Sequence, residues 1–278
     1  MELVDTTFYY YTKDVLGYYN LHAHAYEIEM DGVSGSISPR KIDFNCAGLI
    51  PIKIKMFGLR KLSNNTYAVA LWFKDYMDMP DEHKTKWNVY RINNPILSDN
   101  DIDFDNYYRR YWRGSWAKYP QPLYDLKKKL KEISEITRER FNVGLFDYVE
   151  NPNLIYPLSE HKAQYLNSCL ELFKLFDLNI NIDCLKAIAN FLNKDVQQNN
   201  GNVLRISTLK EFLPKEIQDK IIKPIHNLRD ARGRRGHAIA LSEPYNAHEK
   251  FHGHVLELNS AMEELIIWLK QATDLSKQ

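Results

Sequence analysis

Apolar and polar residues alternate along several segments near the start of the chain, and this alternation indicates β-strands. From Ile50 to Phe57, apolar residues occupy every second position and lysines stand between them, as in a half-buried strand. Three further segments are strand candidates: Leu21 to Met30, Tyr67 to Phe73 and Trp87 to Ile92. Turn-forming residues separate them, including Asp31-Gly32, Gly35, Ser38-Pro39 and Asn93-Asn94-Pro95. We therefore expect an antiparallel sheet in this part of the chain.

Beyond Pro122 the apolar residues recur at intervals of three and four, which is the period of amphipathic helices. The first of these segments, Leu123 to Phe141, predicts a helix with a lysine-rich outer face. Further helices are expected over Ser159 to Phe176, Ile182 to Leu192, Thr208 to Leu228 and Phe251 to Leu269. Pro214 and Pro224 are expected to interrupt the segment that begins at Thr208, because proline removes a helical hydrogen bond.

The two parts also differ in composition, since 14 of the 18 tyrosines and four of the five tryptophans lie before residue 126. Aromatic residues favour strands. We therefore predict an α+β protein, with a β-rich antiparallel domain over residues 1–150, including a connecting helix, and an all-α helical bundle over residues 151–278. The break at Asn151-Pro152-Asn153 marks the expected boundary. The first domain is expected to sense a ligand or a partner.

The overall composition excludes some classes of protein. The 278 residues contain 37 Lys and Arg against 36 Asp and Glu, so a strongly basic nucleic-acid binder is ruled out, although a local basic patch is not. No apolar run approaches the roughly 18 residues that span a bilayer, and no basic segment precedes an apolar run at the start, so neither a membrane protein nor a secretory signal is expected. Three cysteines without CxxC spacing suggest the reducing cytoplasm.

One short window, Lys223 to His237, is strongly charged: it contains five Lys and Arg residues and a single acid, Asp230. Such an excess in a chain of net charge +1 favours a phosphate-facing surface. The alternative is a solvated helix end, because cations are stabilised near the C-terminus of a helix.

The spacing of two residues in this window suggests chemistry. Arg232 and His237 are separated by Gly-Arg-Arg-Gly. Arginine is a permanently charged, planar phosphate ligand, and histidine exchanges a proton near neutral pH. Together they can cleave RNA without a metal: His237 would act on the 2′-hydroxyl or the leaving oxygen, and Arg232 would stabilise charge on phosphorus.

The stretch Leu228-Arg229-Asp230-Ala231-Arg232-Gly233-Arg234-Arg235-Gly236-His237 resembles the R-x4–6-H motif of HEPN domains, which lies near the start of the last helix of a small helical bundle. The resemblance covers residues 158–270. It implies a metal-independent endoribonuclease without a cofactor, acting on RNA as a homodimer formed through the helical domain. HEPN domains occur in phage defence and toxin–antitoxin systems, so an antitoxin or regulatory protein is a further expected partner.

The same resemblance assigns roles to individual residues. It implies that Arg232 and His237 form the catalytic pair and that Arg229 is an auxiliary phosphate contact; Arg234, Arg235 and Lys223 are further candidates for RNA phosphates. One position departs from the family, because Gly233 stands where a polar residue often follows the motif arginine. Some HEPN domains only bind nucleotides or proteins, so a non-catalytic binding module is the alternative.

A rival motif is His248-Glu249-Lys250-Phe251-His252, which has the HExxH spacing of zinc peptidases. On a helix His248 and His252 share a face and could hold zinc, with Glu249 as general base. The usual third ligand is missing, since His254 lies on another face of the helix. A histidine-rich first turn of the last helix is the simpler interpretation.

Two further segments carry residues with possible binding chemistry. His22 and His24 would project from one face of a strand and could contact a metal with Glu27 or Glu29, although such pairs more often face solvent. The segment Tyr107 to Trp116 mixes arginines with aromatic residues, which can stack on bases and hold phosphates. Packing of its aromatic residues against the sheet, with the arginines turned outward, is the favoured interpretation.

Overall fold

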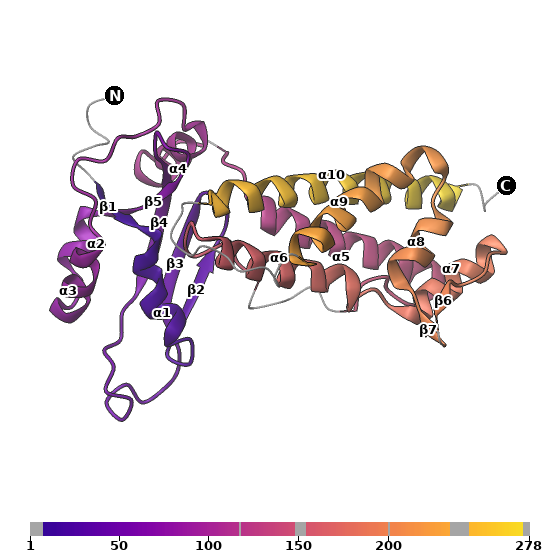
Figure 1. Ribbon diagram of the computed structural model, residues 1–278, viewed down its shortest axis with the longest axis horizontal. Helices are drawn as coiled ribbons and strands as arrows, with labels where there is room; N and C mark the ends of the chain where they lie inside the picture. Colours follow the sequence, from indigo (N-terminus) through magenta and orange to yellow (C-terminus); the bar gives the residue numbers. More distant parts are fainter. Residues whose placement is uncertain (1–7, 117, 148–153, 200, 234–244, 275–278) are drawn as a thin grey trace. The chain divides into compact units, whose positions relative to one another are not determined.

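The computed structural model describes residues 8–116, 118–147, 154–199, 201–233 and 245–274, and it shows an N-terminal antiparallel sheet followed by a helical region (Figure 1). The predicted α+β class is confirmed. The chain forms two compact units. The sheet unit comprises residues 1–121, 155–165 and 239–250, and the helical unit comprises residues 122–154, 166–238 and 251–278.

This division differs from the boundary expected near residue 150. Helix α5 (Pro122–Phe141) belongs to the helical unit, where Leu126, Leu130 and Ile133 are fully buried. The helix expected to connect the domains is therefore a core element of the second unit, because its apolar stripe is buried there. Two short later segments belong to the sheet unit, which no local pattern in the sequence indicates.

The sheet has five strands, namely β1 (Phe8–Thr12), β2 (Tyr26–Met30), β3 (Ser34–Pro39), β4 (Ile54–Lys61) and β5 (Tyr67–Trp72). Their order is β1-β5-β4-β3-β2, and all neighbouring pairs are antiparallel. The helices of the sheet unit are the 3₁₀ helix η1 (Lys13–Leu16), α1 (Gly17–Leu21), α2 (Phe73–Met77), α3 (Asp81–Val89) and α4 (Ile102–Trp112).

Helix α4 packs against one face of this sheet, with Phe104 and Tyr107 fully buried in the shared core. Gly58 in β4 permits the close approach, because a Cβ there would lie 2.5 Å from a ring atom of Phe104 and 2.8 Å from one of Tyr107. Asp101 caps the helix: its carboxylate accepts hydrogen bonds from the backbone N–H of Phe104 at 3.2 Å and of Lys61 at 2.6 Å. The cap therefore joins the start of α4 to the end of β4.

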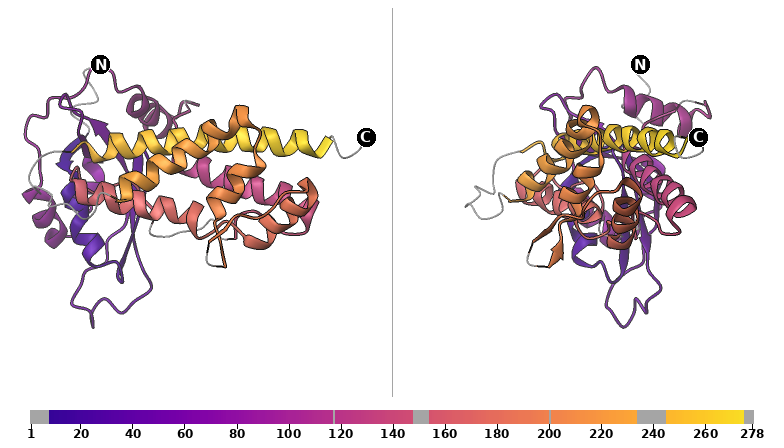
Figure 2. Two further views of the ribbon diagram at one scale, coloured as in Figure 1. Left: turned by 45° about the vertical axis from the view of Figure 1, so that its right-hand side comes forward. Right: turned by 90° about the vertical axis from the view of Figure 1, so that its right-hand side faces the viewer.

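The remaining elements are α6 (Lys162–Asp177), α7 (Ile182–Leu192), β6 (Gln198–Asn199), β7 (Asn202–Val203), α8 (Arg205–Phe212), α9 (Lys215–Gly233) and α10 (Ala247–Asp274). In the helical unit α5 and α10 lie side by side. Lys129 pairs with Glu263 at 3.1 Å, and further along both helices Glu132 pairs with Lys270 at 2.8 Å. The contacts advance together, so the two helices run in the same direction (Figure 2).

Most of the predicted helices are confirmed. Helix α7 has the expected bounds, and the predicted apolar stripe of α10 is buried along its whole length. The break at Pro214 is also confirmed, but Pro224 lies inside α9 and does not end it. Ile221, Ile225 and Leu228 are fully buried, and this packing offsets the roughly 3 kcal/mol that an internal proline costs. In the described part of the chain, no helix is both long and apolar enough to cross a bilayer.

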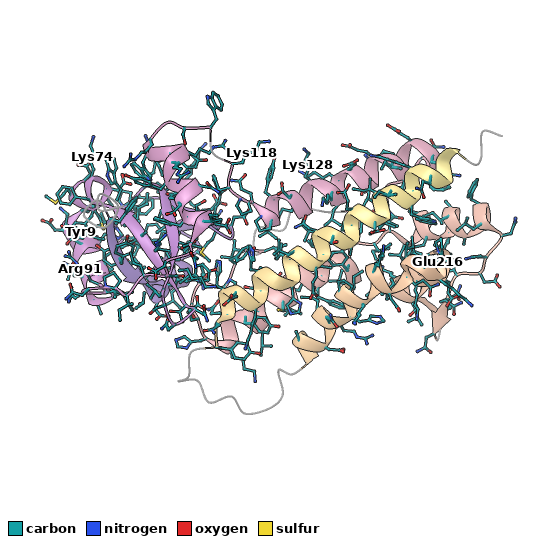
Figure 3. All side chains as sticks on the ribbon, turned by 90° about the horizontal axis from the view of Figure 1, so that it is seen from above. Tyr9, Lys74, Arg91, Lys118, Lys128 and Glu216 are labelled. Carbon is teal, nitrogen blue, oxygen red and sulfur yellow. The ribbon has the colours of Figure 1, made fainter. Side chains whose placement is uncertain are left out.

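The strand predictions are confirmed in part. Three predicted segments overlap β2, β4 and β5 but differ from them at their ends, whereas β1 lies outside every predicted strand and β3 lies among residues expected to form turns. A strand over Trp87 to Ile92 is wrong, because α3 continues to Val89 and only Arg91 forms an isolated bridge. Trp87 packs edge-on against Tyr11 with ring centres 4.8 Å apart, and Arg91 stacks on Tyr9 (Figure 3).

Candidate functional site

Helix α9 carries the charged window into the helical unit. Its buried residues face the core, while Lys223, Arg229 and Asp230 are exposed. Lys223 and Arg229 are six residues apart, which at 3.6 residues per turn places them roughly 120° apart around the helix. The two cations therefore do not share a face, and Arg229 is the one nearer the end of the helix.

Arg232 lies in the last turn of α9, but its side chain is outside the described residues. Arg234, Arg235 and His237 also fall outside the described part of the chain. The expected placement of the motif near the start of the last helix needs correction. Helix α10 begins only at Ala247, and the motif starts instead at the end of α9, because that helix continues through Pro224 to Gly233.

A second imidazole, that of His226, lies near Arg229 on α9. His226 is half-buried and precedes Arg229 by three residues, so the two side chains lie on neighbouring turns of one side of the helix. Burial lowers the pKa of His226, and the positive charge of Arg229 lowers it further. Both effects favour the neutral imidazole, whereas Asp230 opposes them. The sequence gives no reason to single out His226, which is expected to serve the fold or to lie on the surface.

Arg229 itself is available to a ligand. Its Nε lies 3.5 Å from an oxygen of Asp230, but both side chains are more than half exposed. An ion pair of this kind contributes little free energy, typically about 0–1 kcal/mol, because water competes for both partners. A phosphate could therefore displace the carboxylate at small cost.

The HExxH motif has a different role from the one its spacing suggests. His248 is buried in the sheet unit, and both of its ring nitrogens are occupied. The ammonium of Lys13 donates to Nδ1 at 3.2 Å, so the ring proton is on Nε2, which donates to the carbonyl oxygen of Gly32 at 2.9 Å. A nitrogen engaged in this way has no lone pair to offer a metal.

The other members of the motif are not gathered around His248. Glu249 is half exposed and pairs with Lys61 at 2.9 Å. Among the residues that the structure describes, which include the partly buried His252, no group of three His, Cys, Asp or Glu side chains is suited to hold a metal. The arrangement therefore gives no support to the zinc-peptidase alternative.

His248 belongs instead to a buried polar cluster of the sheet unit. Lys13 Nζ lies 3.3 Å from the carboxylate of Glu160, whose second oxygen accepts the backbone N–H of His248 at 3.2 Å. The rings of Tyr67 and Tyr156 contact the imidazole, with centres 4.2 Å and 4.7 Å away. The cluster fixes the first turn of α10 within the sheet unit.

The two weaker candidate segments are also placed. His22 and His24 lie in the turn after α1, not on a strand, since β2 begins at Tyr26; their ring centres are 6.0 Å apart, and His22 Nδ1 is 2.8 Å from the carbonyl oxygen of Tyr18. In the segment Tyr107 to Trp116 the favoured interpretation is confirmed in part: Tyr107, Tyr108 and Trp112 pack in the core of the sheet unit and the arginines are exposed. Tyr111 and Trp116 are exposed instead of packing there.

In comparisons with known proteins, no family model, curated protein or solved structure matches this chain. The resemblance to HEPN domains therefore rests on the residues of the motif alone.

Proposed function

We propose that the protein is a metal-independent endoribonuclease of HEPN type, with Arg232 and His237 as its catalytic pair. One observation carries the proposal: α9, a helix of the helical unit, presents an exposed, weakly paired Arg229 and ends with Arg232 in its last turn, five residues before His237. A helix end that is followed by further arginines suits the binding of an anionic strand.

The proposed reaction uses the 2′-hydroxyl of RNA as the nucleophile. His237 takes the proton of that hydroxyl, and its oxygen forms a bond to phosphorus. The bond from phosphorus to the 5′-oxygen breaks, and this oxygen takes a proton from the imidazolium of His237 or from that of a second copy. Arg232 stabilises the negative charge on phosphorus. The products are a 2′,3′-cyclic phosphate and a 5′-hydroxyl end.

Arg229, Arg234, Arg235 and Lys223 would bind flanking phosphates. We further propose that the helical unit forms a homodimer that brings two motifs together, and that the activity serves phage defence or toxin-like growth control under an antitoxin or regulatory protein. The proposed location is the cytoplasm. The free thiols of the chain, of which Cys46 is exposed, suit a reducing compartment.

The test is cleavage of a single-stranded RNA oligonucleotide by the full chain in EDTA. We expect products with cyclic phosphate ends and no cleavage of the all-deoxy oligonucleotide. His237→Ala and Arg232→Ala should each lower the rate at least a hundredfold, the lower end of what general acid–base catalysis contributes. His24→Ala, a change of an exposed histidine in a turn of the sheet unit, should have no effect.

Cleavage that needs an added divalent metal, or that survives His237→Ala, would contradict the proposal. If the wild-type chain binds the RNA but never cuts it, the non-catalytic module replaces the ribonuclease. The salt dependence of RNA affinity then tests the arginines separately: Arg234→Ala with Arg235→Ala should make the slope of log affinity against log salt less steep by about one to two units, at about 0.7 for each phosphate released.

A further inference from the structure

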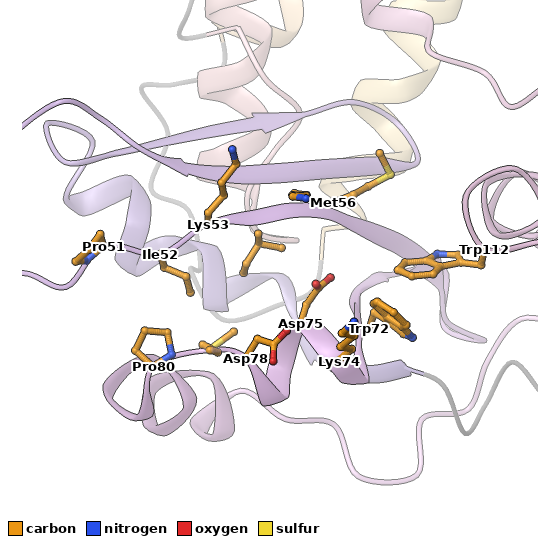
Figure 4. Close-up of a pocket in the computed structure, with 13 residues that line it drawn as sticks. Pro51, Ile52, Lys53, Met56, Trp72, Lys74, Asp75, Asp78, Pro80 and Trp112 are labelled. Atoms are coloured by element: carbon orange, nitrogen blue, oxygen red, sulfur yellow. The ribbon is translucent and has the colours of Figure 1, made fainter. Parts of the chain in front are cut away.

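The sheet unit contains a cavity of about 590 Å³ that the proposed ribonuclease chemistry does not use (Figure 4). It is bounded by residues 51–56, which lead into β4, by residues 72–80 around α2, and by Trp112 at the end of α4. Its volume lies in the range of about 300–1,000 Å³ that small-molecule sites occupy.

Two tryptophans form one end of the cavity. The rings of Trp72 and Trp112 are half-buried, with centres 4.4 Å apart and planes inclined by 50°. Lys74 Nζ lies 5.8 Å from the centre of the Trp72 ring. Indole surfaces stack on planar heteroaromatic rings, and an adjacent ammonium attracts an anionic substituent of such a ring.

The carboxylate of Asp75 points into the space between the lining residues (Figure 4). It is half-buried, and among the described residues no side chain or backbone group forms a hydrogen bond or ion pair with it. Burial raises the pKa of Asp75, with Asp78 adding to the shift and Lys55 and Lys74 opposing it. Its oxygens remain accessible to solvent, so a ligand that brings N–H groups can replace the water there.

The charges around the cavity favour a ligand with a negative group as well. Lys53, Lys55 and Lys74 line it with exposed ammonium groups, against the two carboxylates of Asp75 and Asp78. The lining therefore combines a stacking surface, an acceptor for N–H donors and an excess of cations.

We propose that this cavity binds a guanine nucleotide. The base stacks on Trp72 and Trp112, and its N1–H and exocyclic N2–H donate together to the two oxygens of Asp75. The lysines hold the phosphates. Adenine fits less well, because its N1 is an acceptor and would face the carboxylate. This site lies in the sheet unit and is independent of the proposed cleavage by the helical unit.

The test is a titration of the full chain with GTP, ATP, guanosine and inorganic tripolyphosphate, followed by quenching of tryptophan fluorescence. A Trp116→Phe background removes the signal of a fully exposed indole. We expect GTP to bind at least tenfold more tightly than ATP or tripolyphosphate. Asp75→Asn should weaken GTP at least tenfold, and Lys55→Gln should weaken GTP more than guanosine.

Asp81→Asn is the matched control, because that carboxylate is 94% exposed and does not line the cavity; it should leave GTP affinity unchanged. No quenching by GTP at millimolar concentration would overturn the proposal. Equal affinity for GTP and tripolyphosphate would also overturn it, because tripolyphosphate binding needs only the lysines. So would a GTP affinity that is unchanged in Asp75→Asn. If Asp75→Asn does not fold, an unchanged GTP affinity in Lys55→Gln would overturn the proposal instead. None of these measurements depends on RNA cleavage.

Discussion

The buried pair of Lys13 and Glu160 offers a sharp test of the structure, through the substitution Glu160→Gln. The side chain of Lys13 is only 1% exposed and that of Glu160 is 13% exposed, so water stabilises the lysine charge very little. Glutamine keeps the size of the side chain but removes the negative charge. The ammonium can still donate to His248 Nδ1 and to the amide oxygen of the glutamine, but it loses its anionic partner.

The expected cost follows from the burial. Removing one partner of a buried ion pair typically costs about 3–5 kcal/mol. There is also a ceiling, because the lysine can release its proton: from the ordinary pKa of 10.5, this costs about 5 kcal/mol at pH 7, at 1.36 kcal/mol per pH unit. The folded wild-type chain already bears part of this cost, because burial lowers its Lys13 pKa. We therefore expect Glu160→Gln to lower the free energy of unfolding by about 3 kcal/mol, a large share of the roughly 5–15 kcal/mol typical of a domain.

The stability of the fold also depends on pH through Lys13. Burial lowers the pKa of Lys13 in the folded chain, against the opposing effect of Glu160. The unfolded chain therefore binds more protons at this site, and stability rises with pH up to the unfolded value of 10.5. Without Glu160 the folded pKa falls further, so the defect of Glu160→Gln should shrink as the pH is raised from 7 towards 10.

Urea unfolding followed by tryptophan fluorescence measures these changes, because four of the five tryptophans lie in the sheet unit. Glu27→Gln is the control: its pair with Arg40 is about half exposed on both sides and should contribute less than about 1 kcal/mol. Adding Lys13→Met to Glu160→Gln should restore at least about 2 kcal/mol. A Glu160→Gln defect equal to that of Glu27→Gln, or one that does not change with pH, would refute the burial of this charge.

Three further predictions concern the sheet unit. Gly58→Ala should destabilise by about 1–3 kcal/mol in thermal melting, because the new methyl group would overlap Phe104; a wild-type melting temperature would contradict this packing. Burial lowers the pKa of His83 below the 6.5 of the unfolded chain. The neutral imidazole therefore contributes its full stability above pH 6.5, and this contribution is lost as the pH falls through the lowered pKa. In urea titrations, His83→Gln should lose less stability than the wild type between pH 7 and pH 5. Asp101→Ala removes the cap of α4 and should cost about 1–2 kcal/mol in the same assay; a loss below 0.5 kcal/mol, roughly that of a neutral surface change, would argue against the cap.

The helices could be predicted from the sequence because their signal is local. In α7, Cys184, Leu185, Ile188 and Ala189 recur with helical spacing and are all buried, and Asn181 caps the helix with its side chain. Each of these cues acts within a few residues. The end of α9 could not be predicted in this way, because the packing that carries the helix past Pro224 is tertiary.

The missed strands lack the alternation that marks a half-buried sheet. In β1, Tyr10 and Tyr11 are both buried although they face opposite sides, so no polar residue marks an outer face. In β3, Gly35 has the residue type that favours turns, but it lies within a strand, and a Cβ there would be 2.4 Å from the ring of Phe57. The residue is small because the neighbouring strand needs the space, and a single sequence does not distinguish this reason from a turn.

The candidate sites also depend on tertiary contacts that local sequence patterns do not reveal. These contacts bear on the choice between the HExxH motif and the basic motif of α9. The HExxH spacing is local, but whether its imidazole is available depends on Lys13, which lies 235 residues away and occupies Nδ1. The same criterion can be applied to α9. Among the residues that the structure describes, the ion-pair partner of Arg229 is the exposed carboxylate of Asp230, so a phosphate can reach the guanidinium without breaking a buried contact there. The basic motif is therefore the better candidate for binding a ligand, since the histidine of the rival motif is already used in holding the fold together.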